Sequence, residues 1–302
     1  MKNFRKIGLS ALAGSLVMFS VNADVGVTGS SELTYSSGSG SNGSNSVDGN
    51  PFAMSHDINF TGSGELDNGF TYSMKSNIAT QDMALDSSIL KIDMGDLGTI
   101  GFDQGSGAFG ISTLENNVPT AYEQADHGVG TLAHGIDAVG NTNVIGYSNT
   151  FGGVGISLQY NPDINTQTPN QAGSTSSAGS TGTNWNGAAS MAVPGLDGMT
   201  LAVGYSDTES TVANVTDNTE LTASLNYTMG AVSVGYQQSS VNNNGGSTGA
   251  EVTAYGIAFN VNENLSISYS VNDNEKTNAS AAHVTEESKG YQAAYSMGSA
   301  SF

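Results

Sequence analysis

Five carboxylates lie in or beside one long segment of the chain, where they could attract or bind a cation. They are Asp103, Glu115, Glu123, Asp126 and Asp137. Hard cations take oxygen ligands, so the last four could form a weak calcium site. Carboxylates that line a narrow passage could also favour cations over anions without binding any of them tightly. Both interpretations place the chemistry in the segment 104–142.

Two histidines in this segment raise the question of a metal centre. His127 and His134 lie close to Asp126 and Asp137. Their separation of seven residues is not a spacing known for metal-binding histidines, and the surrounding sequence is irregular and rich in Gly. We therefore favour polar residues of a loop over a metal centre.

Other catalytic patterns are absent or lack the context they need. Residues 105–110 match G-x-G-x-x-G, but neither a following helix nor a strand–helix–strand unit supports a dinucleotide site. No Ser, His and Asp have a credible spacing for a triad. The chain has no Cys, which excludes thiolate nucleophiles and thiolate metal sites. We expect no enzyme activity and no firmly bound cofactor, with calcium as the one candidate.

The segment 104–142 has no clear strand or helix period, and loops of this length are usually functional or disordered. A solvated linker would contain fewer apolar residues than this segment does. They are Phe109, Ile111, Leu114, Val118, Tyr122, Val129, Leu132 and Ile136. The sequence therefore predicts a loop that packs against another part of the protein.

Short strands with alternating apolar and polar residues are predicted on both sides of this loop. In one of them, Leu201, Val203 and Tyr205 alternate with Ala202 and Gly204. Such strands begin after tight turns, end in Tyr and continue into longer polar loops. A period of two places one class of residue on each face. We count fourteen full strands, the last of which ends near Tyr295.

The composition of the two faces favours a membrane barrel over a soluble sheet. One face carries Ser, Thr, Asn, Gln and Gly, and aromatic residues gather at strand ends, as in transmembrane β-barrels. A soluble sandwich would carry more charge on its polar face, and a solenoid would need a fixed repeat. The backbone must satisfy its own hydrogen bonds in lipid, so the sheet should close. The predicted fold is an all-β, antiparallel, up-and-down transmembrane barrel.

The first 23 residues are predicted to be a cleaved export signal. Lys2, Arg5 and Lys6 precede an apolar run from Ile7 to Phe19, and small residues follow at 21–23. The barrel domain would then occupy residues 24–302. No later run of 18 apolar residues predicts a membrane helix.

Removal of this signal makes an already acidic chain, with a formal charge of −20, more acidic still. Three of the seven basic residues are lost, which leaves four Lys against 27 acidic residues and a formal charge of −23. A nucleic-acid partner is disfavoured because phosphate binding needs clustered Lys and Arg. Cations are the natural partners of such a chain.

These features resemble the Gram-negative general porin family of the outer membrane. The most specific segment is 95–102, GDLGTIGF, which is similar to the strand that precedes the pore-constricting third loop. The resemblance implies a homotrimer of sixteen-stranded barrels surrounded by outer-membrane lipid and lipopolysaccharide. It also implies that the loop at 104–142 folds inward, and that small hydrophilic solutes and ions diffuse passively through each barrel. The family's Arg cluster is missing, because the mature chain has no Arg.

Charged residues on the predicted polar face would line the pore. They are Glu32, Asp57, Lys75, Lys91 and Asp93, and the two Lys could be a reduced form of the Arg cluster. Acidic residues outnumber basic ones here and in the loop, so we expect cation selectivity. The alternative function is a surface adhesin or a structural barrel without an open pore, which would use external loops such as 162–183.

Two further expectations concern the oligomer and the end of the chain. Gly29, Ser31 and His56 are small or polar on the predicted outer face, so residues 25–100 should form the subunit interface. His56 could instead lie near the membrane surface.

The last residues, 295–302, match 227–234, where a strand, a tight turn and a new strand follow one another. We therefore expect a turn at Met297 and Gly298, with Phe302 in a fifteenth strand, and a chain that stops before the barrel is complete. The competing interpretation is one unbroken strand from Tyr291 to Phe302.

Overall fold

The computed structural model describes ten stretches of the chain, all of them strands, turns and short 3-10 helices. They are residues 24–35, 52–79, 84–115, 117–122, 142–162, 181–213, 217–243, 248–278, 284–297 and 300–301. The chain divides into two compact units, residues 1–106 and 107–302. No helix in these stretches is long and apolar enough to cross a membrane. The predicted signal at residues 1–23 lies outside the described residues.

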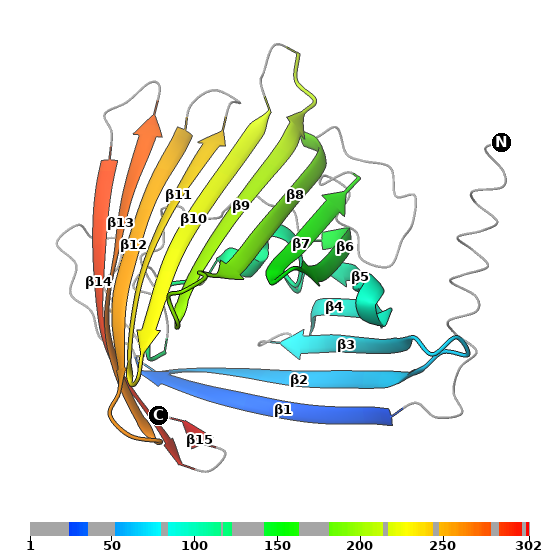
Figure 1. Cartoon of the computed structure of the whole chain (residues 1–302), viewed down its shortest axis with the longest axis horizontal. Helices are drawn as coiled ribbons and strands as arrows, with labels where there is room; N and C mark the ends of the chain where they lie inside the picture. The colour runs from blue at the N-terminus through cyan, green and yellow to red at the C-terminus, as the bar shows by residue number, and fades with distance from the viewer. Residues whose placement is uncertain are drawn as a thin grey trace. The chain divides into compact units, whose positions relative to one another are not determined.

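The first unit contains five antiparallel strands in sequence order (Figure 1). They are β1 (Asp24–Tyr35), β2 (Phe52–Glu65), β3 (Thr71–Ala79), β4 (Ala84–Asp93) and β5 (Thr99–Gln104), with the short helix η1 (Gly95–Leu97) before β5. Each strand pairs with the next one along the chain. This is the up-and-down order that the sequence predicts.

The second unit continues the same pattern after the short helix η2 (Gly110–Leu114). Its strands are β6 (Thr142–Phe151), β7 (Val154–Asn161), β8 (Thr181–Ala192), β9 (Met199–Ser210), β10 (Asn218–Met229), β11 (Val232–Asn243), β12 (Thr248–Asn260), β13 (Leu265–Asn278), β14 (Val284–Met297) and β15 (Ala300–Ser301). Every strand pairs antiparallel with its neighbour in sequence. The predicted all-β, antiparallel, up-and-down fold is confirmed.

Tight turns close one end of the strand pairs, as the sequence predicts. Between β6 and β7, Gly152 and Gly153 have φ values of 58° and 85°. A two-residue hairpin of this kind needs positive φ at both positions, which Gly adopts without strain. Short turns also join β8 to β9, β10 to β11 and β12 to β13. At the other end, longer connections join β7 to β8 and β9 to β10, whereas only four residues separate β11 from β12 and five separate β13 from β14.

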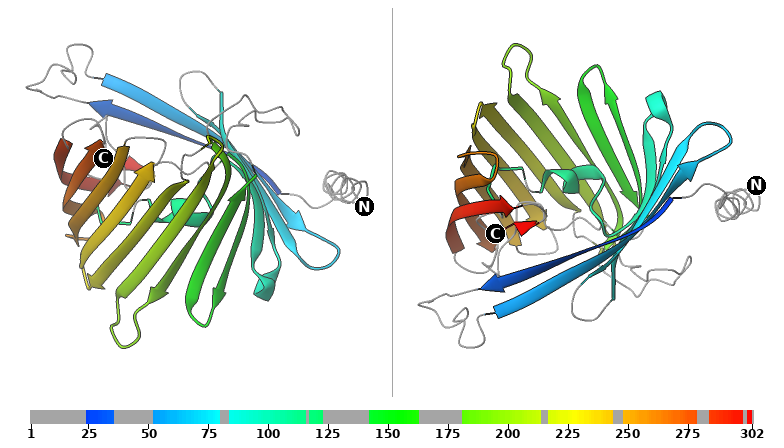
Figure 2. Two further views of the ribbon diagram at one scale, coloured as in Figure 1. Left: turned by 90° about the horizontal axis from the view of Figure 1, so that it is seen from above. Right: turned by 90° about the horizontal axis from the view of Figure 1, so that it is seen from below.

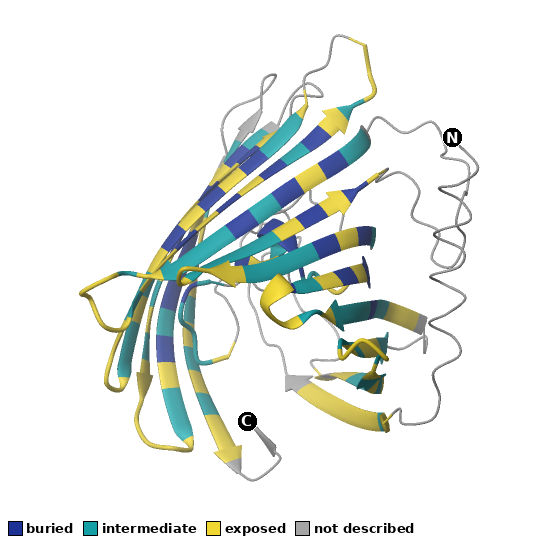
Figure 3. Cartoon of the chain, turned by 45° about the vertical axis from the view of Figure 1, so that its right-hand side comes forward, coloured by how far each residue is buried: buried dark blue, intermediate teal, exposed yellow. Residues whose placement is uncertain are grey.

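In the second unit, exposed and buried residues alternate along the strands (Figure 3), and the exposed ones face outward and are largely apolar, while many of the buried ones are polar. On β9, Leu201 and Val203 are 40% and 45% exposed, whereas Ser206 and Thr208 are 1% and 3% exposed. Apolar surface in water costs about 25 cal/mol per Å². An outward face of this composition therefore suits lipid. This agrees with the predicted membrane barrel, whose apolar face is turned outward and whose polar face is turned inward.

The end of the chain follows the predicted turn. β14 ends at Met297, and Ala300 and Ser301 of β15 pair back with Met297 and Ser296. The competing interpretation of one unbroken strand from Tyr291 is therefore wrong. The predicted count of fourteen strands and the start of a fifteenth is confirmed in the part of the chain that the structure describes. Phe302 lies outside it.

Candidate functional site

Residues 107–115 and 117–122, together called the inner loop below, lie on the inward face of β6–β14 (Figure 2). The predicted packing of this loop is confirmed for four apolar side chains. Phe109, Ile111, Leu114 and Val118 are 0–7% exposed. Tyr122 differs from the prediction, since it is 59% exposed. Val129, Leu132 and Ile136 lie outside the described residues.

Wall side chains bind both ends of η2. A short helix leaves backbone groups at its ends without partners, and buried groups of this kind must find them elsewhere. Gly110 N donates to Ser157 Oγ of β7 at 2.8 Å, and Ile111 N donates to Asn186 Oδ1 of β8 at 2.9 Å. At the other end, Gln237 Nε2 of β11 donates to Leu114 O at 2.8 Å. These contacts fix η2 against three strands.

The two amides that bind η2 are themselves held by buried neighbours. Asn186 Nδ2 donates to Asn184 Oδ1 at 2.7 Å, and Asn184 Nδ2 donates to Thr208 Oγ1 at 2.7 Å. Gln237 Nε2 also donates to Thr222 Oγ1 at 3.0 Å. Hydrogen bonds in a buried network support one another. The side chains of the wall are therefore held in orientations that bind η2 in one position.

The second half of the inner loop is held by contacts with β10, β13 and β14. Asn226 Nδ2 of β10 donates to Asn117 O at 2.6 Å, and Asn117 Nδ2 donates to Ser224 Oγ. Ala121 N then donates to Ser268 Oγ of β13 at 2.8 Å. Tyr122 N donates to Gln292 Oε1 of β14 at 3.2 Å. The loop therefore crosses the inner wall from β6 towards β14.

Glycines on the inward face allow the loop to lie directly on the strands. Phe109 covers Gly146 of β6, and Ile111 covers Gly204 of β9. Pro119 covers Gly235 of β11, and Val118 covers Gly256 of β12. A side chain at any of these four positions would meet loop atoms.

In the first unit, the predicted pore-wall residues share one face of the sheet. Residues opposite one another in antiparallel strands lie on the same face. Lys75 faces Ile89, which in turn faces Asp103, while Lys91 faces Ser73 and Asp93 faces Thr71. On the first two strands, Asp57 faces Ser30 and Glu32 faces Ser55. The alternation along each strand therefore places Glu32, Asp57, Lys75, Lys91, Asp93 and Asp103 together on the polar face.

Two of these carboxylates have local structural contacts. Asp103 is fully buried, and its Oδ1 accepts a hydrogen bond from Ser106 N at 2.8 Å. Asp93 Oδ1 accepts from Gly95 N at 2.8 Å, at the start of η1. Glu32, Lys75 and Asp93 are exposed, whereas Asp57 and Lys91 are half-buried. Asp103 therefore supports the start of the loop, whereas the other five carry charge on or near the surface.

The remaining loop acids are only partly placed. Glu115 is exposed and follows directly after η2. Glu123, Asp126 and Asp137, with His127 and His134, lie outside the described residues. Elsewhere in the described stretches no group of three or more His, Cys, Asp or Glu could hold a metal ion. The possible calcium site therefore stays a prediction.

The wall residues that hold the loop were not predicted from the sequence. Ser157, Asn186, Asn226, Gln237 and Ser268 are ordinary members of the polar face when only the alternation is considered. Asn, Gln and Gly at inward positions of the strands after the loop could have indicated that the loop packs on these strands. The loop atom that each residue contacts could not have been predicted, since 47 to 170 residues separate the partners.

Comparisons with known proteins agree with this architecture. The sequence profile of the Gram-negative porin family matches residues 8–299. Among solved structures, Salmonella typhi OmpF in complex with daunomycin has 13% identity and a TM-score of 0.61, over 91% of this chain and 86% of that one. The trimer form of OmpT, an outer membrane protein of Vibrio cholerae, has 10% identity and a TM-score of 0.60, over 92% and 85%.

These structural similarities show the fold, and no curated protein matches the chain. The family match covers almost the whole length, including every described strand except β15. It agrees with the inverted faces and with the order of the strands. The chain belongs to the Gram-negative porin family, whose fold is a transmembrane β-barrel.

Proposed function

We propose that this protein is an outer-membrane channel through which small hydrophilic solutes and ions diffuse passively. The observation that carries the proposal is the contrast between the two faces of β6–β14. The outward face is apolar and suits lipid, while the inward face is polar and carries the inner loop. A water-filled passage needs a polar lining, and a loop on that lining would narrow the passage.

The proposed channel prefers cations. On the polar face of the first unit, Glu32, Asp57 and Asp93 outnumber Lys75 and Lys91, and Glu115 adds an exposed carboxylate beside η2. Glu123, Asp126 and Asp137 would add to this excess from the rest of the loop. In water, a unit charge at about 10 Å contributes about 0.4 kcal/mol, or about twofold in local ion concentration. Several such charges give a clear preference.

Planar-bilayer recording tests both parts of the proposal. The purified protein should insert in steps of constant conductance, and a KCl gradient should give a reversal potential of the cation-selective sign. The alternative functions, a surface adhesin or a plugged structural barrel, predict no steps at all. An anion-selective sign would refute the cation preference and leave the channel in place.

We also propose a homotrimer in the outer membrane whose subunits meet through residues 25–100. Gly29 faces Ile58 and Ser31 faces His56 across β1 and β2, so small and polar groups interrupt an otherwise apolar face. Valines and Leu33 on the same strand are 62–78% exposed. Such a surface fits a neighbouring subunit better than lipid. Cross-linking in mild detergent should yield trimers, and His56→Glu should weaken them. Monomers alone would contradict the proposal.

Weak calcium binding at Glu115, Glu123, Asp126 and Asp137 is a separate proposal. Oxygen ligands from a flexible segment typically give low affinity. Calorimetric titration with calcium should show a weak site that Asp126→Asn removes. An unchanged titration in that variant would exclude the site.

A further inference from the structure

We infer that four glycines of the inner wall, Gly146, Gly204, Gly235 and Gly256, set the bore of the channel. They act by letting the inner loop lie directly on the backbone of β6, β9, β11 and β12. This inference rests on the proposed channel function, because a bore has meaning only if solutes pass. The glycines are positioning residues, since they act on the passage through the loop that they seat.

Gly256 gives the clearest evidence. A Cβ atom at this position would lie 2.8 Å from Val118 Cγ1 and 2.9 Å from Pro119 O. Ordinary contacts between carbon atoms are about 3.5–4.0 Å. A side chain could rotate away from the new methyl group, but the carbonyl of Pro119 belongs to the loop backbone. The loop itself would therefore have to move off the wall.

Gly235 and Gly204 repeat this arrangement on neighbouring strands. At Gly235, an added Cβ would collide with Pro119 Cδ and with Asn226 Oδ1, the amide that holds Asn117. At Gly204, it would lie 2.6 Å from Ile111 Cγ1 and 3.2 Å from Leu114 Cδ1. The atoms in the way belong mainly to the inner loop in both cases.

Gly146 leaves the space that Phe109, the first buried apolar side chain of the loop, occupies. An added Cβ there would overlap the ring of Phe109, which is 1% exposed. Phe109, Ile111, Val118 and Pro119 therefore each occupy a position that only a glycine leaves open. These four contacts hold the loop close to the wall, so that less of it projects into the proposed passage.

Gly155 of β7 provides a matched control on the same inward face. It lies two residues from Ser157, which binds Gly110 N. An added Cβ at Gly155 would meet only Ser190, at 3.3 Å from Oγ, and no atom of the loop. A substitution at Gly155 therefore tests the loss of a strand glycine without disturbing the loop.

The test is a series of Ala and Val at Gly256, recorded in planar bilayers beside the same series at Gly155. Single-channel conductance and the largest neutral polymer that enters should fall from Gly to Ala to Val at Gly256. They should stay at the wild-type values at Gly155. Constant or rising conductance at Gly256, or an equal fall at Gly155, would overturn the inference. A wild-type protein without conductance would instead refute the proposed function.

A labelling experiment gives a second measurement, which begins with single variants of the loop that leave the wall unchanged. The chain has no Cys, so each introduced thiol is the only one. A thiol at Val118→Cys, which is 7% exposed in the native protein, should react slowly with a membrane-impermeant reagent, and Tyr122→Cys, which is 59% exposed, should react fast. Addition of Gly256→Val should make the thiol at 118 reactive. Equal rates at 118 and 122, or no change with Gly256→Val, would overturn the inference.

Discussion

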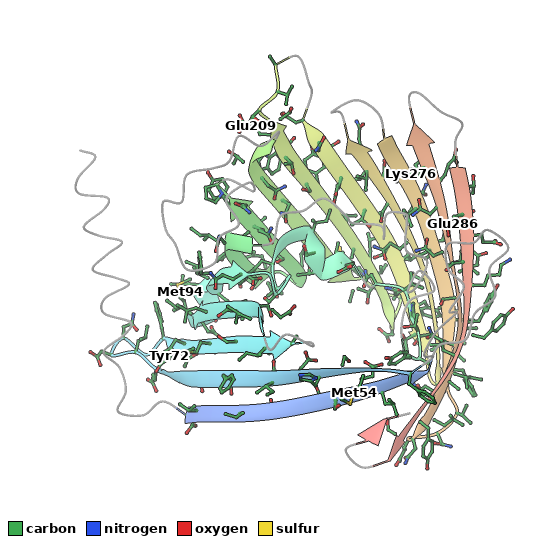
Figure 4. All side chains as sticks on the ribbon, turned by 180° about the vertical axis from the view of Figure 1, so that it is seen from behind. Met54, Tyr72, Met94, Glu209, Lys276 and Glu286 are labelled. Carbon is green, nitrogen blue, oxygen red and sulfur yellow. The ribbon has the colours of Figure 1, made fainter. Side chains whose placement is uncertain are left out.

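The polar face of β1–β5 carries charge near water, whereas the side chains of β7–β14 that hold the inner loop are uncharged. On the first, Glu32, Asp57, Lys75, Lys91 and Asp93 are exposed or half-buried and charged. On β7–β14, every side chain named above as a hydrogen-bond partner of the inner loop is uncharged. In the second unit, Lys276 and Glu286 lie near the ends of β13 and β14 that residues 279–283 connect (Figure 4), and Glu220 is buried near the start of β10.

This difference indicates that one set of residues fixes the position of the inner loop and another set supplies the charge that acts on ions. A buried ion must be stripped of water, at a cost that a hydrogen-bonded amide or hydroxyl largely avoids. Neutral side chains are therefore suited to fixing a loop against a dry wall. Charged side chains influence passing ions only if they remain near water. The predictions below test this division, beginning with the largest expected effect.

The largest effect is expected from replacement of Gln237, an uncharged wall residue that holds the inner loop. In Gln237→Leu, Leu114 O loses its partner while buried against the wall, and Thr222 loses a neighbour as well. A buried polar group without a partner costs about 1–3 kcal/mol. We expect a loss of stability of this size in denaturant unfolding in detergent, together with altered conductance.

Gln238→Leu is the control for this experiment. Gln238 is the next residue on β11, is exposed on the outward face and has no described contact with the loop. Its replacement should leave stability and conductance close to wild type. Equal effects at positions 237 and 238 would mean that Gln237 does not hold the loop.

The charged face is tested by Lys75→Gln combined with Lys91→Gln. Removal of two positive charges should raise the preference for cations, by about twofold in local ion concentration per charge at about 10 Å in water. Reversal potential in a KCl gradient measures the change. Lys289→Gln is the matched control, because Lys289 lies outward on β14 beside Glu287, at 2.5 Å. A shift only in the control would place the selective charges elsewhere.

The smallest expected effect is that of pH on the loop position. The named wall partners contain no group that titrates between about pH 5 and about pH 8. The labelling rate of Val118→Cys relative to Tyr122→Cys should therefore be the same at both ends of this range. The ratio corrects for the pH dependence of thiol reactivity itself. A ratio that approaches one at either end would reveal a titratable contact that holds the loop.

Much of the fold could be predicted because the period of two is strong in each strand. Tyr205 and Leu201 mark the outward face of β9, and the same alternation assigns Lys75 and Asp57 to the polar face. Strand ends were less accurate. The fourteenth strand, predicted to end near Tyr295, ends at Met297 in the structure.

The loop contacts could be predicted only in outline. The apolar content of the segment correctly indicated packing of Phe109 and Val118. The role of Gly256 and Gly235 could not be predicted, because the space above a strand glycine is known only when the register and the position of the loop are both known. Asp103 looked like a pore-lining acid, yet it is fully buried and supports the turn into the loop.

The most direct test of the division between position and charge is one bilayer experiment that records conductance and reversal potential on the same membranes. It compares Gln237→Leu with Asp57→Asn combined with Asp93→Asn. The account predicts that Gln237→Leu changes conductance and leaves the reversal potential near wild type, while the double variant moves the reversal potential away from cation preference with little change in conductance. Equal changes of both quantities in both proteins would contradict it.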